Sequence, residues 1–280
     1  MAVSKTFTIG NDRHVRRLGY GAMRLTGQPA NFGPYADWEG GKKLLRRAVD
    51  LGVDFIDTAR AYGPGWNERL IADALYPYPP DLVIATKGGI VKKSATERHL
   101  DGTPAGLRRD CEESLRNLRL DQIELYQLHW VDPNTPLEES VSALAKLREE
   151  GKIRHIGLCN LTLDQLRAVV HLAPITSVQN RYSFSDRKDD AIVDYCAGEG
   201  IVFLPYGPLG GDPFKPGSPL ARSEGHLAEI AARRQATAAQ VALAWLLRRA
   251  PNIIAIPGTT SIAHLEENVA AATLQLNGAL

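Results

Sequence analysis

Short apolar runs alternate along the chain with longer segments in which apolar and polar residues recur at helical spacing. The short runs are rich in Val, Ile and Leu and nearly continuous, which is typical of parallel strands covered on both faces. We predict strands at residues 17–21, 53–58, 82–87, 123–129, 155–160, 175–180, 202–207 and 253–258. Eight is the number of strands that closes a barrel, so the pattern predicts an α/β fold, a (β/α)₈ TIM barrel.

The segments between these runs predict the helices of the barrel. We expect helices at residues 39–51, 68–75, 104–117, 137–149, 162–171, 188–196 and 238–249, and another that begins at about residue 262. Gly52, Gly151 and Gly200 stand where a helix passes into the next strand, and Thr162 is a candidate N-cap. These end signals support the alternation.

Two segments fall outside the alternation. Residues 6–15 predict an N-terminal β-hairpin that turns at residues 10–12 and would plug the bottom of the barrel. Residues 207–224 are rich in Gly and Pro, and a loop of that length in a compact barrel is usually functional. No change of composition divides the chain, so residues 1–280 are expected to form a single barrel domain. The competing doubly wound fold binds dinucleotides through GxGxxG, which the sequence lacks.

Composition narrows the class of protein further. The formal net charge is only +1 and no run of five like charges occurs, so we expect no nucleic-acid partner. Three widely spaced cysteines fit neither a disulfide framework nor a zinc site, which favours a cytoplasmic location. Residues 1–10 lack the pattern of a secretory signal, and no apolar run is as long as a membrane span, so we expect no membrane partner. We also expect a monomer or weak homo-oligomer.

Four polar residues stand at or just after the ends of successive predicted strands: Asp57, Tyr62, Lys87 and His129. In a barrel of this type the reactive groups gather at the C-terminal ends of strands, so all four should face one mouth. A phenol has a pKa of about 10, and a nearby ammonium favours its ionised form. We therefore interpret Tyr62 as a general acid, Lys87 as the group that lowers its pKa and Asp57 as the residue that holds Lys87. His129 would be a donor that orients the carbonyl or relays the proton.

Other interpretations of these residues stay open. A single strand-end Asp is more often a loop cap, and a strand-end Lys usually extends to water. A desolvated Lys87 is also a candidate Schiff-base nucleophile. A metal-dependent hydrolase needs converging His and carboxylate ligands, but His129 has no HxH partner, so no metal is expected.

These residues lie in motifs that resemble the aldo-keto reductase family. DTARAYG at residues 57–63 looks like the family's DTAxxYG segment, Lys87 ends an ATK strand, and QLHW at 127–130 matches the LLH strand. RHIGLCN at 154–160 is similar to R-x-I-G-x-S-N, with Cys159 where Ser is usual, and the similarity spans residues 17–272 in family order. Within the family the sequence looks closest to bacterial pyridoxal reductases.

The resemblance implies an NADP(H)-dependent oxidoreductase that reduces an aldehyde or ketone, with pyridoxal as a candidate, to an alcohol by hydride transfer. In the family's pattern Asn160 and Gln179 bind the nicotinamide carboxamide and Tyr206 stacks on the ring. His264 stands where the family has Arg, so NADH remains an alternative to NADPH. The cofactor-binding residues implied are Gly21, Ala22, Met23, Asp57, Asn160, Gln179, Tyr206, Gly207, Pro208, Leu209, Gly211, Gly258, Thr259, Thr260, Ser261, His264, Glu267 and Asn268.

The resemblance also implies an apolar pocket for a small-molecule carbonyl substrate. Its expected substrate-binding residues are Met23, Tyr62, Trp66, His129 and Trp130. Relatives carry a further C-terminal segment that often shapes this pocket, so the size of the substrate stays open. Some relatives bind cofactor chiefly to regulate partners. A non-catalytic NADPH sensor is therefore a third alternative, beside the Schiff-base enzyme and the metal-dependent hydrolase.

Overall fold

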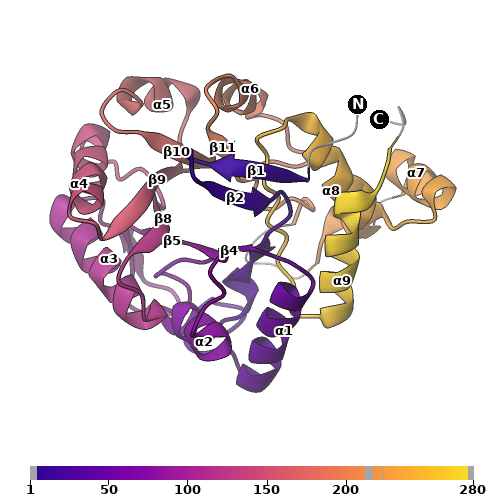
Figure 1. The fold of residues 1–280 in the computed structure, drawn as a ribbon, viewed down its shortest axis with the longest axis horizontal. Helices are drawn as coiled ribbons and strands as arrows, with labels where there is room; N and C mark the ends of the chain where they lie inside the picture. The colour runs from indigo at the N-terminus through magenta and orange to yellow at the C-terminus, as the bar shows by residue number, and fades with distance from the viewer. Residues whose placement is uncertain (1–4, 212–216, 223, 277–280) are drawn as a thin grey trace.

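A curled sheet of seven parallel strands forms the centre of the computed structural model, which describes residues 5–211, 217–222 and 224–276 (Figure 1). Each strand pairs in parallel with its neighbours. From one edge to the other the strands are β3 (Tyr20–Gly21), β4 (Phe55–Asp57), β5 (Val83–Gly88), β8 (Ile123–Leu128), β9 (Ile153–Cys159), β10 (Ile175–Gln179) and β11 (Val202–Phe203).

The predicted eighth strand is present as a short connecting segment that closes the barrel. Ile253 makes a parallel bridge to Phe203, and Ala255 makes one to Leu18. The N–H of Ile254 donates to the Phe203 carbonyl at 3.1 Å, and that of Gly19 donates to Ala255 at 2.8 Å. The segment pairs through isolated bridges rather than a regular ladder, and Pro257 within the predicted range has no N–H to extend one. The predicted (β/α)₈ barrel is confirmed.

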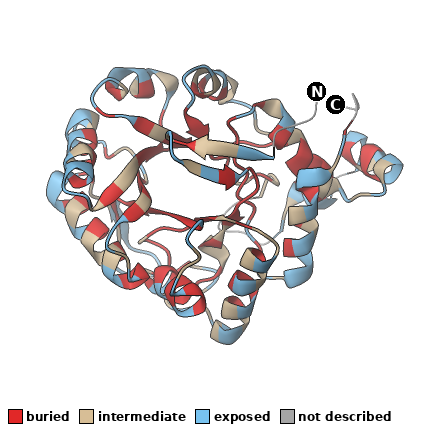
Figure 2. Ribbon diagram, viewed as in Figure 1, coloured by how far each residue is buried: buried red, intermediate tan, exposed pale blue. Residues whose placement is uncertain are grey.

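Helices cover the outside of the sheet (Figures 1 and 2), and two of them keep their predicted bounds. These two are α4 (Leu137–Glu149) and α8 (Ala238–Arg249). The others are α1 (Trp38–Asp50), α2 (Trp66–Leu75), α3 (Pro104–Leu118), α5 (Leu163–Val169), α6 (Asp190–Gly198), α7 (His226–Arg234) and α9 (Ile262–Ala270). Helix α7 was not predicted. In the described part of the chain no helix is long and apolar enough to cross a membrane.

Two antiparallel hairpins lie outside the barrel sheet. The predicted N-terminal hairpin, β1 (Thr6–Ile9) with β2 (Arg13–Arg16), is confirmed and lies across the barrel in Figure 1. Its Ile9 and Val15 side chains are fully buried in a cluster with Phe55 and Leu125, so they fill one end of the barrel interior. The second hairpin was missed: β6 (Ile90–Lys92) pairs with β7 (Arg98–Leu100) directly after β5.

A buried arginine ties the closing segment to the barrel. The Arg17 guanidinium donates to the carbonyls of Ile253 at 2.9 Å and Leu247 at 2.7 Å, and also to that of Ala250. Burial lowers the pKa of Arg17 to about 10. The guanidinium therefore satisfies carbonyl groups at the end of α8 that would otherwise be buried without a donor.

We predict that Arg17→Met destabilises the protein by about 2–4 kcal/mol, because it leaves buried carbonyls without donors. The free energy of unfolding measured by urea denaturation checks this. Arg248→Met, which changes an exposed arginine on α8, is the control and should shift it by less than about 0.5 kcal/mol. Equal losses in the two variants would contradict the assigned role of Arg17.

Candidate active site

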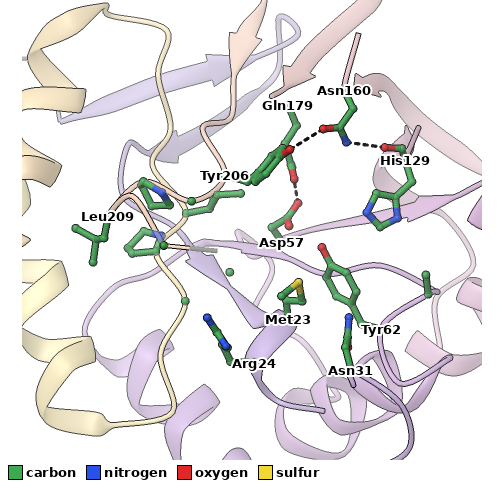
Figure 3. A pocket seen from close by; sticks show the side chains of 18 of the residues that line it. Met23, Arg24, Asn31, Asp57, Tyr62, His129, Asn160, Gln179, Tyr206 and Leu209 are labelled. Atoms are coloured by element: carbon green, nitrogen blue, oxygen red, sulfur yellow. Dashed lines mark hydrogen bonds between the residues drawn. The ribbon is translucent and has the colours of Figure 1, made fainter. Parts of the chain in front are cut away.

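A pocket opens at the C-terminal ends of the barrel strands, and the four predicted catalytic residues come together there; Figure 3 shows three of them, Asp57, Tyr62 and His129. Asp57 ends β4, Lys87 is the penultimate residue of β5 and His129 directly follows β8. Tyr62 lies in the loop after β4. Asp57, Tyr62 and His129 line the pocket, while Lys87 lies fully buried beneath them.

Lys87 and Asp57 form a buried ion pair. The Lys87 Nζ donates to Asp57 Oδ2 at 2.6 Å and to the Thr58 carbonyl at 2.8 Å. Burial is the largest single influence and by itself would lower the pKa of Lys87, but Asp57, Tyr62 and Cys159 together outweigh it and the net shift is upward. A protonated amine is a poor nucleophile, so this environment argues against the Schiff-base interpretation.

Tyr62 lies next to this ammonium, with the Lys87 Nζ at 5.2 Å from the centroid of its ring. Burial raises the pKa of Tyr62 to about 12, and the Lys87 charge offsets only part of that rise. The net direction is opposite to the lowering expected from the sequence, because desolvation of the phenolate is the larger effect. In this environment Tyr62 keeps its proton at neutral pH.

The loop that carries Tyr62 depends on a glycine at the next position. Gly63 has φ +77°, and a Cβ there would lie 2.7 Å from the Gly33 carbonyl oxygen. The Tyr62 N–H donates to the Ala59 carbonyl at 2.9 Å, which closes a turn after β4. The local sequence therefore turns the phenol back over the strand ends.

His129 faces Tyr62 edge-on, with ring centroids 5.7 Å apart and an interplanar angle of 77°. Burial, together with the charges of Lys87 and Arg98, holds the pKa of His129 well below its usual range. Its Nδ1 is buried and, among the described residues, has no hydrogen-bond partner. The imidazole is therefore neutral, and a lone pair is easier to leave unpaired at Nδ1 than an N–H, so we assign the ring hydrogen to Nε2.

Amide side chains complete the polar floor of the pocket. Gln179, the last residue of β10, donates to Asp57 Oδ1 at 2.8 Å, and Gln127 donates to the same oxygen at 3.3 Å. Asn160 donates to the His129 carbonyl at 3.0 Å and accepts from the Tyr206 hydroxyl at 2.9 Å (Figure 3). These bonds fix the amides that the sequence assigned to the cofactor. The part of Gln127 in this network was not predicted.

The predicted cofactor residues divide between this pocket and its surroundings. Those that line it are Gly21, Met23, Asp57, Asn160, Gln179, Tyr206, Gly207, Pro208, Leu209, Gly211 and Gly258. Ala22 is buried behind the pocket, where its carbonyl accepts from Asn67 at 2.9 Å. Thr260 and Ser261 line a second depression beside Lys43, at the start of α9. Thr259, His264, Glu267 and Asn268 line neither.

The glycine-rich turn after Tyr206 folds back closely on itself. Gly207 has φ +63°, and a Cβ at Gly211 would lie 2.9 Å from the Gly217 carbonyl oxygen. Both glycines line the pocket, next to the half-buried Tyr206 ring. Residues 212–216 and 223 of the predicted functional loop lie outside the described residues, and residues Pro219–Arg222 form a 3₁₀ turn.

The two predicted substrate tryptophans differ in position. Trp130 lines the pocket and is exposed. Trp66 does not line it; its ring packs edge-on against Trp38 at 6.1 Å and under the Arg69 guanidinium at 5.1 Å. Trp66 begins α2, and its side chain lies against Trp38 at the start of the preceding helix, α1.

Several lining residues were not predicted from the sequence. They include Arg24, Asn31, Lys92 and Arg98. Lys92 and Arg98 belong to the missed β6–β7 hairpin, so they enter the pocket from a segment that the strand pattern did not show. In the described part of the chain no cluster of three or more His, Cys, Asp or Glu residues has the arrangement of a metal site.

Comparisons with known proteins place this geometry in a family. The model described as the aldo/keto reductase family matches residues 17–279. Pyridoxine 4-dehydrogenase of Escherichia coli K12 is 44% identical over 98% of this chain and 95% of its own length. The glycerol dehydrogenase AKR11B4 of Gluconobacter oxydans is similar in structure, with a TM-score of 0.82 at 27% identity over 97% of this chain and 90% of that one. An aldo/keto reductase of Klebsiella pneumoniae, solved in complex with NADP and acetate, has a TM-score of 0.81 at 29% identity over 99% and 92%.

Proposed function

The chain belongs to the aldo/keto reductase family of oxidoreductases, and we propose that it reduces an aldehyde to an alcohol with NADPH, with Tyr62 as the proton donor. One observation carries the proposal. The buried Lys87 ammonium lies between the Asp57 carboxylate and the Tyr62 ring, and His129 faces the same ring from the pocket wall. A protonated phenol beside a neutral imidazole is suited to a developing alkoxide.

The pocket residues fit a nicotinamide cofactor. Tyr206 presents a half-buried ring beside Asn160 and Gln179, and the glycine turn at 207–211 lets backbone approach an anionic group. We propose that Asn160 and Gln179 bind the carboxamide, Tyr206 stacks on the ring and the turn follows the pyrophosphate. The start of α9, at Ser261, would hold the phosphate on the adenosine ribose. The Klebsiella pneumoniae relative bound to NADP supports the choice of NADPH.

The protein's own residues would then handle the proton. NADPH, when bound, supplies the hydride to the carbonyl carbon. Tyr62 donates its hydroxyl proton to the carbonyl oxygen, and the neighbouring Lys87 ammonium stabilises the negative charge left on the phenol. His129 donates a hydrogen bond from Nε2 to the same oxygen and so orients the carbonyl. Asp57 holds Lys87 in place, while Gln127 and Gln179 hold Asp57.

The name of the Escherichia coli relative suggests a first substrate. Because pyridoxine 4-dehydrogenase is 44% identical, we propose pyridoxal as a substrate of this chain, reduced at its aldehyde. The purified protein should oxidise NADPH in the presence of pyridoxal, and pyridoxine should appear in equal amount by chromatography. A protein that binds NADPH, as measured by fluorescence quenching, but turns over neither pyridoxal nor simple aromatic aldehydes would instead support the cofactor-sensor alternative.

A further inference from the structure

The loop between β3 and α1 places an amide side chain on the wall of the pocket. Asn31 lines the pocket and is only 5% exposed. Figure 3 shows its side chain below Tyr62, on the opposite side of that residue from Asn160 and Gln179. The two amides proposed for the cofactor therefore lie on one side of the phenol, and Asn31 lies on the other.

The backbone of Asn31 is held against the loop that carries the proposed proton donor. Its carbonyl accepts from the Lys92 Nζ at 2.7 Å and from the Gly63 N–H at 3.4 Å, and the Gly33 N–H donates to the Gly63 carbonyl at 3.1 Å. Gly63 directly follows Tyr62. Asn31 has φ +52°, in the left-handed region, where Asn is among the best tolerated of the residues other than Gly. These contacts fix the place of its side chain beside Tyr62.

The side chain of Asn31 is held through its oxygen. The Thr26 hydroxyl donates to Asn31 Oδ1 at 2.7 Å; its other acceptor, the Met23 carbonyl, is farther away at 3.0 Å. Thr26 is buried, and its hydroxyl oxygen accepts from Gln28 Nε2 at 3.0 Å. Among the described residues the Asn31 Nδ2 has no hydrogen-bond acceptor. The amide thus keeps two N–H donors for a ligand, in an orientation that is already fixed.

The surroundings of Asn31 suit an aromatic ligand that carries a polar substituent. The apolar side chains of Ala61, Ile90 and Trp130 line the same pocket. An unpaired donor in such a wall favours a ligand that brings an acceptor, because the donor otherwise stays without a hydrogen bond once the ligand has displaced water. Asn31 lies against the loop of Tyr62, so the acceptor belongs on the side of the ligand that carries the carbonyl.

We propose that Asn31 is a specificity-determining residue, whose side-chain amide donates a hydrogen bond to an oxygen on the ring carbon next to the one that carries the substrate's carbonyl group. This inference rests on the proposed function and names the substrate class of the same site: aromatic aldehydes with a neighbouring ring oxygen, as in pyridoxal. Tyr62 and His129 bind the carbonyl oxygen, and Asn31 binds the second oxygen. An aldehyde without that second oxygen leaves the amide unpaired and is reduced less efficiently.

The test compares two aldehydes of the same shape, 2-methoxybenzaldehyde and 2-ethylbenzaldehyde. The methoxy oxygen can only accept a hydrogen bond, and the ethyl group can make none. The measured quantity is the ratio of kcat/KM for the methoxy compound to that for the ethyl compound, and the intrinsic reactivities of the two aldehydes cancel when a variant is compared with the parent. Asn31→Gly should lower this ratio about fivefold, mainly through KM. Glycine adopts φ +52° without strain, so the loop keeps its backbone.

Two more variants test which end of the amide faces the substrate. Asn31→Asp keeps an acceptor for Thr26 but replaces the donor by a carboxylate oxygen, so the ratio should fall about tenfold or more. Thr26→Val removes the hydroxyl that orients the amide and should lower the ratio about twofold in the parent, but not further in the Asn31→Gly background. The same reduction in both backgrounds would contradict the orienting contact and overturn the proposal.

A matched asparagine and a binding measurement serve as controls. Asn11 is exposed in the turn between β1 and β2, and its neighbour Asp12 contacts His155 near the start of β9, at the far end of the barrel from the pocket. Asn11→Gly should leave the ratio unchanged. The dissociation constant of 2-methoxybenzyl alcohol, followed through protein fluorescence, should rise in Asn31→Gly by the same factor as KM, while that of 2-ethylbenzyl alcohol should stay within about twofold.

The remaining outcomes separate the two proposals. Equal ratios in the parent and in Asn31→Gly, with both aldehydes reduced, would overturn the role of Asn31 and leave the proposed function intact. A ratio that rises in Asn31→Gly would mean that the amide turns its oxygen to the ligand, and would overturn the donor role as well. A lower melting temperature or weaker NADPH binding in Asn31→Gly, with an unchanged ratio, would assign Asn31 to the fold or to the cofactor and likewise overturn it. Reduction of neither aldehyde by the parent would count against the proposed function.

Discussion

Tyr62→Phe is expected to lower kcat for aldehyde reduction by about 10³-fold, which is the usual size of a general-acid contribution. The phenyl ring keeps the edge-on contact with His129 and the place beside Lys87, so only the proton donor is lost. The dissociation constant for NADPH should stay within about twofold of the parent value, because a transition-state interaction and not ground-state binding is removed. Single-turnover kinetics with preloaded NADPH measures the first quantity, and fluorescence titration the second.

A matched tyrosine provides the control. Tyr78→Phe removes a hydroxyl that donates to the Leu118 carbonyl at 2.7 Å, and Tyr78 does not line the pocket, so kcat should not change.

The pH dependence gives a further check on Tyr62. The kcat/KM of the parent should stay constant between about pH 6 and 9, because the pKa of Tyr62 is about 12 and the pKa of His129 lies well below its usual range. A Tyr62→Phe variant with parent-like kcat would remove Tyr62 from the proton-donor role.

The strand ends were the most predictable part of the site. Asp57, Lys87 and His129 follow apolar runs whose parallel pairing brings their C-terminal ends to one mouth, so sequence position alone implies that they meet. Tyr62 was found because it follows Asp57 within the same short loop. The sequence predicted where the eighth strand lies in the barrel. It did not show that this segment pairs with its neighbours through isolated bridges instead of a regular ladder.

Other features depend on contacts that no local pattern contains. Strands β6 and β7 have three residues each, too few to show an alternation, so the cations that they place at the pocket were missed. The side chain of Trp66 turns to Trp38 on a neighbouring helix. The direction of the Tyr62 pKa shift depends on how burial compares with the Lys87 charge, and burial of an individual side chain is a tertiary property.

Lys87→Met is expected to lower both stability and activity. Lys87 is fully buried, and the substitution leaves the Asp57 carboxylate buried without its ion-pair partner, which typically costs about 3–5 kcal/mol. Tyr62 also loses the charge that stabilises its phenolate, so kcat should fall by about 10²-fold or more. Urea denaturation and steady-state kinetics measure the two effects separately.

The double variant Asp57→Asn with Lys87→Met separates the structural effect from the catalytic one. The amide oxygen introduced at position 57 would still accept hydrogen bonds from Gln127 and Gln179, and no unpaired charge would remain, so part of the lost free energy of unfolding should return. The activity should not return, because no ammonium lies beside Tyr62. Recovery of kcat along with stability would mean that Lys87 acts only by holding the fold. A double variant that is stable and still inactive places the role of Lys87 in proton transfer, since the ammonium that lies 5.2 Å from the centroid of the Tyr62 ring is absent and the proposed role of Asp57 is only to hold that ammonium.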